Sequence, residues 1–250
     1  MNKYFNEQRQ HTLKYLVGYF TKHINGFRKC RILEIGCAEG GFLDAMWLIA
    51  IKAVGIELNY KRAMVGMVKN PELNIWEGDI TDNHLTEVIF QFEGKFDLII
   101  LRDVIEHITD IVLAFENMER LLKPGGYLYI TFPPKFSAFG GHQQNGKTIL
   151  KYVPFIHILP VWVIKLLGKL FRDSVSEILN SKKHGITVQF FKRIYTQYNF
   201  KPIVKGLFLS RPIFKTRFGI SIIRFPNIPG LRELALGCEY LLRRQNGNNY

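Results

Sequence analysis

The fold is decided by residues 31–51, which read RILEIGCAEGGFLDAMWLIAI. The first five letters form a short apolar run that is typical of a buried β-strand. Glycines at positions 36, 40 and 41 follow directly, and Phe42–Ile51 has the apolar content of a packed helix. Glycine lets the backbone pass close to a ligand where a side chain would block it. The segment therefore predicts a strand, a tight turn and a helix, with a ligand expected at the turn.

The same alternation of strand and helix continues to residue 133. Further strands are predicted at 53–57, 73–77, 96–101 and 127–132, with helices at 60–69 and 110–122. Continuous apolar strands separated by helices indicate a Rossmann-like, doubly wound α/β fold with a mostly parallel sheet. Such a sheet binds its ligands beyond the carboxyl ends of its strands, where the strand order reverses.

The rest of the chain is assigned around this cofactor-binding half, residues 30–133, within one domain of residues 1–250. Residues 1–29 are predicted to be helical. Residues 134–184 open with proline and contain Gly-Gly, so we predict a helical and loop insertion that forms a lid over the site. For residues 185–250 we predict a helix at 187–198, a hairpin of strands 203–210 and 218–225, and a basic tail helix at 231–243.

The charge of the chain is unevenly distributed. The net charge is +13, yet residues 1–133 hold 15 basic and 17 acidic side chains, whereas residues 134–250 hold 19 basic and 4 acidic ones. A near-neutral half followed by a strongly basic half indicates a surface that meets an anionic partner. The alternative is a cationic surface that serves solubility alone.

Composition and cysteine usage exclude several classes of protein. With 47% hydrophobic and 22% charged residues, the chain is globular rather than disordered or fibrous. Its three cysteines have no metal-ligand spacing, so we predict no metal site and a reducing, cytoplasmic location. The N-terminus lacks the pattern of a signal peptide. The most apolar stretch, 153–168, is shorter than the roughly 20 residues of a membrane-spanning helix.

Polar residues follow the predicted strands at the ligand-binding edge. Glu57 ends the second strand, where a carboxylate can accept hydrogen bonds from both hydroxyls of a ribose. The alternative for Glu57 is an acid that interacts with a helix N-terminus. Asp79 and Ile80 follow the third strand and suit an adenine, although a plain turn Asp is also typical there. A polar cluster at residues 102–107 follows the fourth strand.

The chain resembles the class I S-adenosylmethionine-dependent methyltransferases in five motifs taken in order: LEIGCAEGGF (33–42), VGIELN (54–59), EGDI (77–80), FDLIILRDVIEHI (96–108) and LLKPGGYLYITFP (121–133). It looks most like the small-molecule methyltransferases with the Glu-His signature. The resemblance covers residues 31–133 closely. It implies S-adenosylmethionine as the cofactor, S-adenosylhomocysteine as the product, and a seven-stranded sheet whose last strand runs antiparallel.

The resemblance also implies roles for individual residues. On the glycine turn, the residues of the cofactor site would be Glu34, Gly36, Cys37, Ala38 and Gly40. After the later strands they would be Glu57 and Leu58 at the ribose, Asp79 and Ile80 at the adenine, and Arg102 and Asp103 in the wall after the fourth strand. Ala38 departs from the family pattern, in which many members have glycine, but its methyl group is small enough for binding to survive.

The implied reaction transfers a methyl group to an oxygen or nitrogen of an acceptor. A hydroxyl nucleophile needs a base, and histidine is the natural candidate because its ordinary pKa lies near neutrality. His142, just beyond the fifth strand, is the first candidate base, against the alternative of a solvent-exposed loop histidine. His107 is the weaker candidate, because the Glu-His pair would mainly shape the wall of the site.

The acceptor is expected to be small and anionic or lipid-linked. Residues 153–170 mix large apolar side chains with Lys165 and Lys169, which suits contact with a membrane surface, a lid over an apolar substrate, or a core helix. The basic second half would attract anionic lipids. One alternative is an RNA methyltransferase, disfavoured because no RNA-binding module is recognised. The others are a non-catalytic methyltransferase-like binding protein and a dehydrogenase, the latter disfavoured by the glycine spacing.

Overall fold

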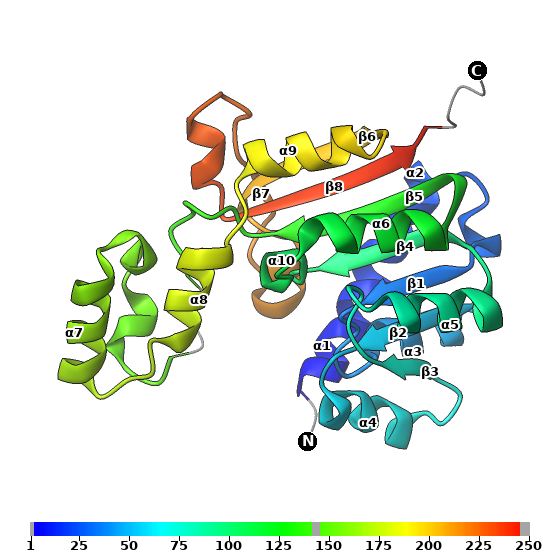
Figure 1. The fold of residues 1–250 in the computed structure, drawn as a ribbon, viewed down its shortest axis with the longest axis horizontal. Helices are drawn as coiled ribbons and strands as arrows, with labels where there is room; N and C mark the ends of the chain where they lie inside the picture. Colours follow the sequence, from blue (N-terminus) through cyan, green and yellow to red (C-terminus); the bar gives the residue numbers. More distant parts are fainter. Residues whose placement is uncertain (1–2, 142–145, 246–250) are drawn as a thin grey trace.

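The structure, a computed structural model, describes residues 3–141 and 146–245 (Figure 1). In these residues, eight strands form one sheet in the order β3-β2-β1-β4-β5-β8-β6-β7. The strands are β1 (Ile32–Ile35), β2 (Ala53–Glu57), β3 (Asn74–Glu77), β4 (Phe96–Arg102), β5 (Leu122–Phe132), β6 (Phe200–Ser210), β7 (Ile223–Arg224) and β8 (Gly237–Arg244). Strands β1 to β5 run parallel to one another, which confirms the predicted mostly parallel, doubly wound α/β fold.

The antiparallel part of the sheet has one strand more than expected. The additional strand is β8, which lies antiparallel between β5 and β6 at the place of the predicted tail helix. Strand β7, at the place of the predicted strand 218–225, has only two residues and pairs with β6 at the sheet edge. The predicted count of seven strands is therefore corrected to eight.

Helices cover both faces of the sheet. On one face, Ile89, Phe115 and Phe191 anchor α5 (Asn83–Glu93), α6 (Ile111–Leu121) and α9 (Val188–Gln197) to the core. On the other face, the core includes Phe20 and Phe42 from α2 (Val17–His23) and α3 (Gly41–Leu48), together with α1 (Lys3–His11). Helix α4 (Tyr60–Lys69) connects β2 to β3, and α10 (Pro212–Phe218) follows β6. The sequence pattern predicted most of these helices but missed α5 and α10.

The insertion forms a small unit of its own beside the carboxyl edge of the parallel strands (Figure 1). It contains α7 (Val161–Phe171), α8 (Ser176–His184) and short 3-10 turns at Ile149–Tyr152 and Ile156–Ile158. Its separate core consists of Leu150, Ile156, Ile164 and Ile178. Residues 153–170 are therefore not a core helix of the main sheet. No helix in the described part of the chain is long and apolar enough to cross a membrane.

Two predictions for the C-terminal part are wrong. The expected tail helix at 231–243 is a short 3-10 turn, Leu231–Leu234, followed by β8. Strand β8 lies inside the sheet and is buried from Gly237 to Leu242, and an apolar run buried on both faces cannot be distinguished from a helix by its period. The expected strand 218–225 shrinks to β7, because α10 takes up its first residue. The predicted hairpin pairing survives as Phe208 opposite Arg224.

Candidate active site

The turn between β1 and α3 brings the backbone close to the end of β4. Gly36 has a φ of +69°, and a Cβ added there would lie 2.4 Å from Cγ2 of Val104. The Gly36 N–H donates to the carbonyl of Ile56 at 2.8 Å, which ties the turn to β2. Ala38 also has a positive φ, of 55°. Glycine adopts this conformation without strain, so the conformation accounts for glycine in the family pattern, whereas Ala38 carries a strain of roughly 1–2 kcal/mol.

Glu57 ends β2 and lies under the turn. Its Oε2 accepts a hydrogen bond from the Ala38 N–H at 2.7 Å, and its Oε1 accepts one from the Asn59 N–H at 2.9 Å. Each carboxylate oxygen has a second lone pair, so Glu57 can still accept from two ligand hydroxyls. The backbone thus holds the carboxylate in place and leaves acceptor capacity toward the cavity.

A cavity of about 310 Å³, which we call the strand-edge cavity, lies beyond the ends of β1 to β4. Eight predicted cofactor residues line it: Gly36, Ala38, Glu57, Leu58, Asp79, Ile80, Arg102 and Asp103. Three do not line it. Cys37 is fully buried in the core, Gly40 precedes α3, and Glu34 lies beneath Arg102. The sequence analysis missed further lining residues, among them Gln8, Arg62 and Val104.

The chemistry of this cavity fits a nucleoside. Asp79 is held at the end of β3 because its Oδ1 accepts from the Thr81 N–H at 2.9 Å. Ile80 beside it is buried in the core and presents an apolar surface. Adenosine requires a carboxylate for its exocyclic amine, an apolar side chain for the face of its ring, and acceptors for its ribose hydroxyls. Asp79, Ile80 and Glu57 have these properties. Gly36 has no side chain, and this leaves room in the cavity at a point where a Cβ would lie too close to Val104.

Arg102 and Glu34 form a buried ion pair under the cavity. The Arg102 Nε donates to Glu34 Oε1 at 2.9 Å, and the guanidinium also lies over the ring of Phe42, 5.2 Å from its centroid. Glu34 is 1% exposed, and in the described residues its Oε2 has no hydrogen-bond partner. Burial raises the pKa of Glu34 to about 7, against the opposing effect of the Arg102 guanidinium. The pair fixes Arg102 at the boundary of the cavity.

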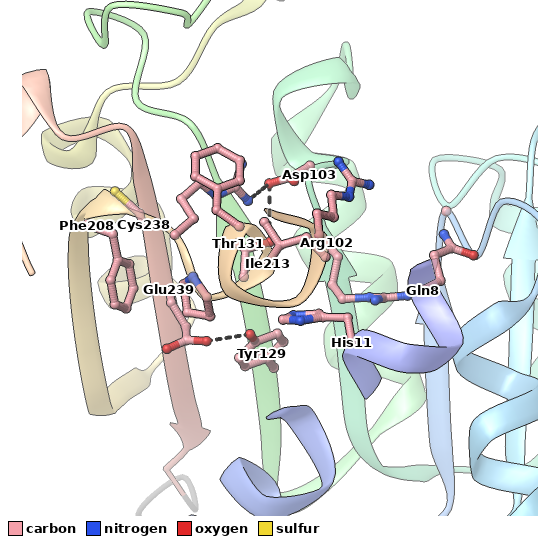
Figure 2. A pocket seen from close by; sticks show the side chains of 15 residues that line it. Gln8, His11, Arg102, Asp103, Tyr129, Thr131, Phe208, Ile213, Cys238 and Glu239 are labelled. Carbon is pink, nitrogen blue, oxygen red and sulfur yellow. Dashed lines mark hydrogen bonds and ion pairs between the residues drawn. The ribbon is translucent and has the colours of Figure 1, made fainter. Parts of the chain in front are cut away.

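A second cavity of about 160 Å³, the inner cavity, adjoins the first (Figure 2). The two share the residues Gln8, Gly36, Arg102 and Asp103. The inner cavity is further lined by His11, Tyr129, Thr131, Phe208, Arg211, Pro212, Ile213, Phe214, Arg217, Cys238 and Glu239. These residues come from α1, β5, β8, the end of β6 and α10, as Figure 2 shows for those it labels.

Ionic and hydrogen-bonded pairs hold the polar wall of the inner cavity. Asp103, with a φ of 55°, pairs with the Arg211 guanidinium and accepts from the Thr131 hydroxyl at 3.3 Å. Tyr129 is 1% exposed, and its hydroxyl donates to Glu239 Oε1 at 2.7 Å. Burial raises the pKa of Glu239 above its ordinary value, although the tyrosine hydroxyl opposes this. The polar side chains of this wall thus hold one another in place.

An open groove of about 1060 Å³, the outer groove, leads to both cavities. It shares Asp103 with both of them and Arg211 and Arg217 with the inner cavity. Apolar side chains also line it, namely Pro133, Phe139, Phe214, Phe218 and Leu236. The carboxylates of Glu39 and Asp103 line it as well, so the groove offers charged side chains of both signs and apolar surface to a ligand larger than the inner cavity.

The two predicted catalytic histidines have different outcomes. His107 is exposed and lines the strand-edge cavity and the outer groove, but it does not line the inner cavity. The surrounding protein partly shields its ring from solvent and so lowers the pKa of His107, although the carboxylates of Asp103 and Glu177 oppose this. His142 lies outside the described residues. In residues 3–141 and 146–245, no group of three or more His, Cys, Asp or Glu side chains could hold a metal ion.

Comparison with known proteins shows the family of the chain. A family model described as a methyltransferase domain matches residues 5–173. A ubiquinone biosynthesis O-methyltransferase from Chelativorans sp. (strain BNC1) is 27% identical over 132 residues, which cover 51% of this chain and 50% of that protein. Another from Aromatoleum aromaticum is 28% identical over 129 residues, with 50% and 53% covered. The chain thus spans about half the length of the curated relatives it matches.

Solved structures share the fold over nearly the whole chain. The plantazolicin methyltransferase BpumL in complex with SAH has a TM-score of 0.61 at 14% identity, covering 98% of this chain and 86% of that one. An S-adenosylmethionine-dependent methyltransferase from Mesorhizobium loti has a TM-score of 0.58 at 15% identity, covering 91% and 96%. At these identities, the likeness concerns the fold.

Proposed function

The chain belongs to the methyltransferase domain family, and on this premise we propose that it transfers a methyl group from S-adenosylmethionine to a small acceptor. The observation that carries the proposal is the strand-edge cavity, where Gly36, Glu57 and Asp79 meet from three different strand ends. Its chemistry fits the adenosine part of the donor. The sulfonium group of the bound donor supplies an activated methyl group.

The two cavities would bind different reactants, the donor in the strand-edge cavity and the acceptor in the inner cavity. Glu57 would accept from the ribose hydroxyls and Asp79 from the adenine amine, while Arg102 would face the carboxylate of the methionine part. The acceptor would occupy the inner cavity, because that cavity shares Gly36 and Asp103 with the donor cavity. Holding the two reactants in line can itself lower the barrier by several kcal/mol, up to roughly 7–11 in ideal cases.

We propose an oxygen atom of an anionic or lipid-linked molecule as the methyl acceptor. The relatives named for ubiquinone biosynthesis O-methylation support a hydroxyl acceptor. The outer groove supports a larger molecule, because Phe139, Phe214 and Phe218 line it together with Arg62 and Arg217. An acceptor whose reactive ring enters the inner cavity could place an apolar or anionic remainder in this groove.

The insertion supports contact with an anionic membrane surface. On α7, Trp162 is 69% exposed, Leu170 is 70% exposed and Leu166 is 57% exposed, so apolar side chains gather on the surface of one short helix. Lys165 and Lys169 lie on the same helix and are also exposed. Apolar side chains that enter the lipid surface, flanked by lysines that attract anionic headgroups, are typical of interfacial helices. Such contact would bring the outer groove to a lipid-linked acceptor.

Calorimetric titration of S-adenosylmethionine tests donor binding. The wild type should bind, and Glu57→Gln should bind at least about tenfold more weakly, because hydrogen bonds to a charged acceptor are worth roughly 1.5–3 kcal/mol. Glu77→Gln is the matched control, since Glu77 ends the neighbouring strand β3 but is exposed and does not line the cavity. Failure of the wild type to bind would refute the proposed activity.

Vesicle binding tests the membrane contact. The protein should bind vesicles of anionic phosphatidylglycerol, lose binding as salt rises, and bind less after Trp162→Ala. Phe92→Ala is the control, because Phe92 is 75% exposed on α5, outside the insertion. Equal binding by both variants, or tight salt-sensitive binding to tRNA without vesicle binding, would contradict the lipid proposal and favour the RNA alternative.

A further inference from the structure

A histidine that no sequence motif singles out lines the inner cavity. His11 is the last residue of α1 and is 6% exposed. Its Nδ1 lies 3.2 Å from the hydroxyl of Thr216 in α10, and its ring stacks on Tyr15 with 5.3 Å between centroids and an interplanar angle of 17°. These contacts hold the ring so that it points into the cavity (Figure 2). Its Nε2 makes no hydrogen bond to any other described residue.

Other titratable groups of this cavity are already engaged. Glu239 accepts from the hydroxyls of Tyr129 and Tyr15. Asp103 is paired with Arg211. Burial raises the pKa of the Cys238 thiol well above its ordinary value, so the thiol stays protonated. His11 thus differs from these side chains in having a ring nitrogen with no partner in the described residues.

The charges around His11 keep its ring neutral. Arg102, Arg211 and Arg217 face it, together with the carboxylate of Asp103. Burial and these three guanidinium groups lower the pKa of His11 to about 3, although Asp103 opposes them. The same positive potential lowers the pKa of any hydroxyl bound in the cavity. Burial lowers the pKa of His11 but raises that of a hydroxyl, so it is the three guanidinium groups that favour loss of the hydroxyl proton in this cavity.

We propose that His11 is the catalytic base of this enzyme, accepting at Nε2 the proton of a hydroxyl acceptor; the proposal rests on the proposed methyl transfer. With Nδ1–H donating to the Thr216 hydroxyl, Nε2 keeps its lone pair toward the cavity. As the new O–CH₃ bond forms, the methyl–sulfur bond breaks, its electron pair stays on sulfur, and the hydroxyl proton moves to Nε2. The positive charge lost at sulfur thus appears on the imidazolium, which passes its proton to water.

The ring nitrogens of His11 can be tested without an acceptor. Nitrogen-15 NMR of the histidine-labelled protein with S-adenosylhomocysteine should show a neutral ring at pH 7, protonated at Nδ1 and bare at Nε2. Comparison with the His11→Gln spectrum assigns the signal. A ring protonated at Nε2 alone, or a charged ring at pH 7, would overturn the proposal whether or not an acceptor has been found.

Turnover of two single-ring probes tests the catalytic role. A cavity of about 160 Å³ matches one aromatic ring, since benzene binds in an engineered cavity of roughly 150 Å³. We choose catechol, which is un-ionised at neutral pH, and 4-nitrocatechol, which is largely ionised and needs less help from a base. His11→Gln should lower kcat for catechol by about 10²-fold or more and lower it much less for 4-nitrocatechol.

Matched measurements separate this role from a structural one. His11→Gln should keep the donor affinity of the wild type in calorimetry, and His84→Gln, an exposed histidine on α5, should keep both rates. Wild-type kcat in His11→Gln, or an equal loss with both probes, would overturn the proposal. If the protein binds the donor but methylates neither probe, the hydroxyl group of a single aromatic ring is not its acceptor. The NMR result would then decide on the role of His11.

Discussion

Replacing Gly36 by alanine tests how closely the glycine turn approaches the end of β4. The new Cβ would lie 2.4 Å from Cγ2, 3.0 Å from Cγ1 and 3.3 Å from Cβ of Val104. A valine side chain has little freedom to turn away, because its branched Cβ restricts χ1. Either the turn or Val104 must therefore move, and Val104 lines the strand-edge cavity. We expect lower stability and weaker binding of S-adenosylmethionine.

The magnitude follows from a comparison with Gly26. Its φ is +72°, close to the +69° of Gly36, but an added Cβ at Gly26 meets no atom within 4 Å. Both substitutions thus carry the same strain of a left-handed alanine, roughly 1–2 kcal/mol, and the same change in the unfolded chain. Only Gly36→Ala adds the overlap, for which overpacking costs of roughly 1–3 kcal/mol are typical. Gly36→Ala should therefore lose about 1–3 kcal/mol more than Gly26→Ala.

Urea denaturation of the two variants measures this difference. Val104→Ala combined with Gly36→Ala should recover most of the extra loss, because it removes both Cγ atoms that the new methyl group meets. Calorimetry of the donor should show weaker binding for Gly36→Ala and wild-type binding for Gly26→Ala. Equal destabilisation of the two single variants, or no recovery in the double variant, would refute the close approach as the reason for glycine at this position.

Three further outcomes follow from the polar groups of the site. Tyr129→Phe removes the 2.7 Å hydrogen bond to buried Glu239 and should lower the free energy of unfolding by roughly 1–3 kcal/mol in urea titrations. The folded-state pKa of Glu34, about 7, lies above its ordinary value of 4.5, so its stabilising contribution is complete below pH 4.5 and is lost as the pH rises through 7. Between acidic and neutral pH, the urea midpoint of the wild type should thus fall more than that of Glu34→Gln. The same pH dependence in both proteins would contradict this. Asp103→Asn leaves the Arg211 guanidinium without its charged partner and should cost roughly 1.5–3 kcal/mol, measured by thermal unfolding against the wild type.

Local sequence patterns determined the parallel half of the sheet. Strand β2 and helix α4 begin and end at the predicted residues, Ala53–Glu57 and Tyr60–Lys69. Strand β2 follows from its length and its flanking residues, because an apolar run of five residues bounded by turn residues is too short for a buried helix, and α4 follows from its helical spacing of apolar residues. The residues that line the strand-edge cavity also follow from this, since each predicted one lies just beyond a strand end or in the turn after it.

Tertiary structure decided the antiparallel half. The segment that forms β8 has apolar spacing compatible with a helix, yet it is a strand because β5 and β6 both pair with it. Its backbone pairs with two strands that are distant from it in the sequence, and such pairing overrides the local preference for a helix. Residues of the insertion gave no pattern that would predict a separate core of Leu150, Ile156, Ile164 and Ile178.

The sequence by itself thus determined the fold class, the family resemblance and the sheet edge at which we propose that the donor binds, because each predicted residue that lines the strand-edge cavity lies within a few residues of a recognisable strand. The inner cavity depended on tertiary structure alone. His11, Tyr129, Arg211 and Glu239 come from α1, β5, the end of β6 and β8, and no local pattern connects them. They meet only because α1 and α10 pack together over the ends of β5 and β8. Short-range periodicity encodes the elements of a chain, whereas contacts between distant elements build the inner cavity, the proposed acceptor site.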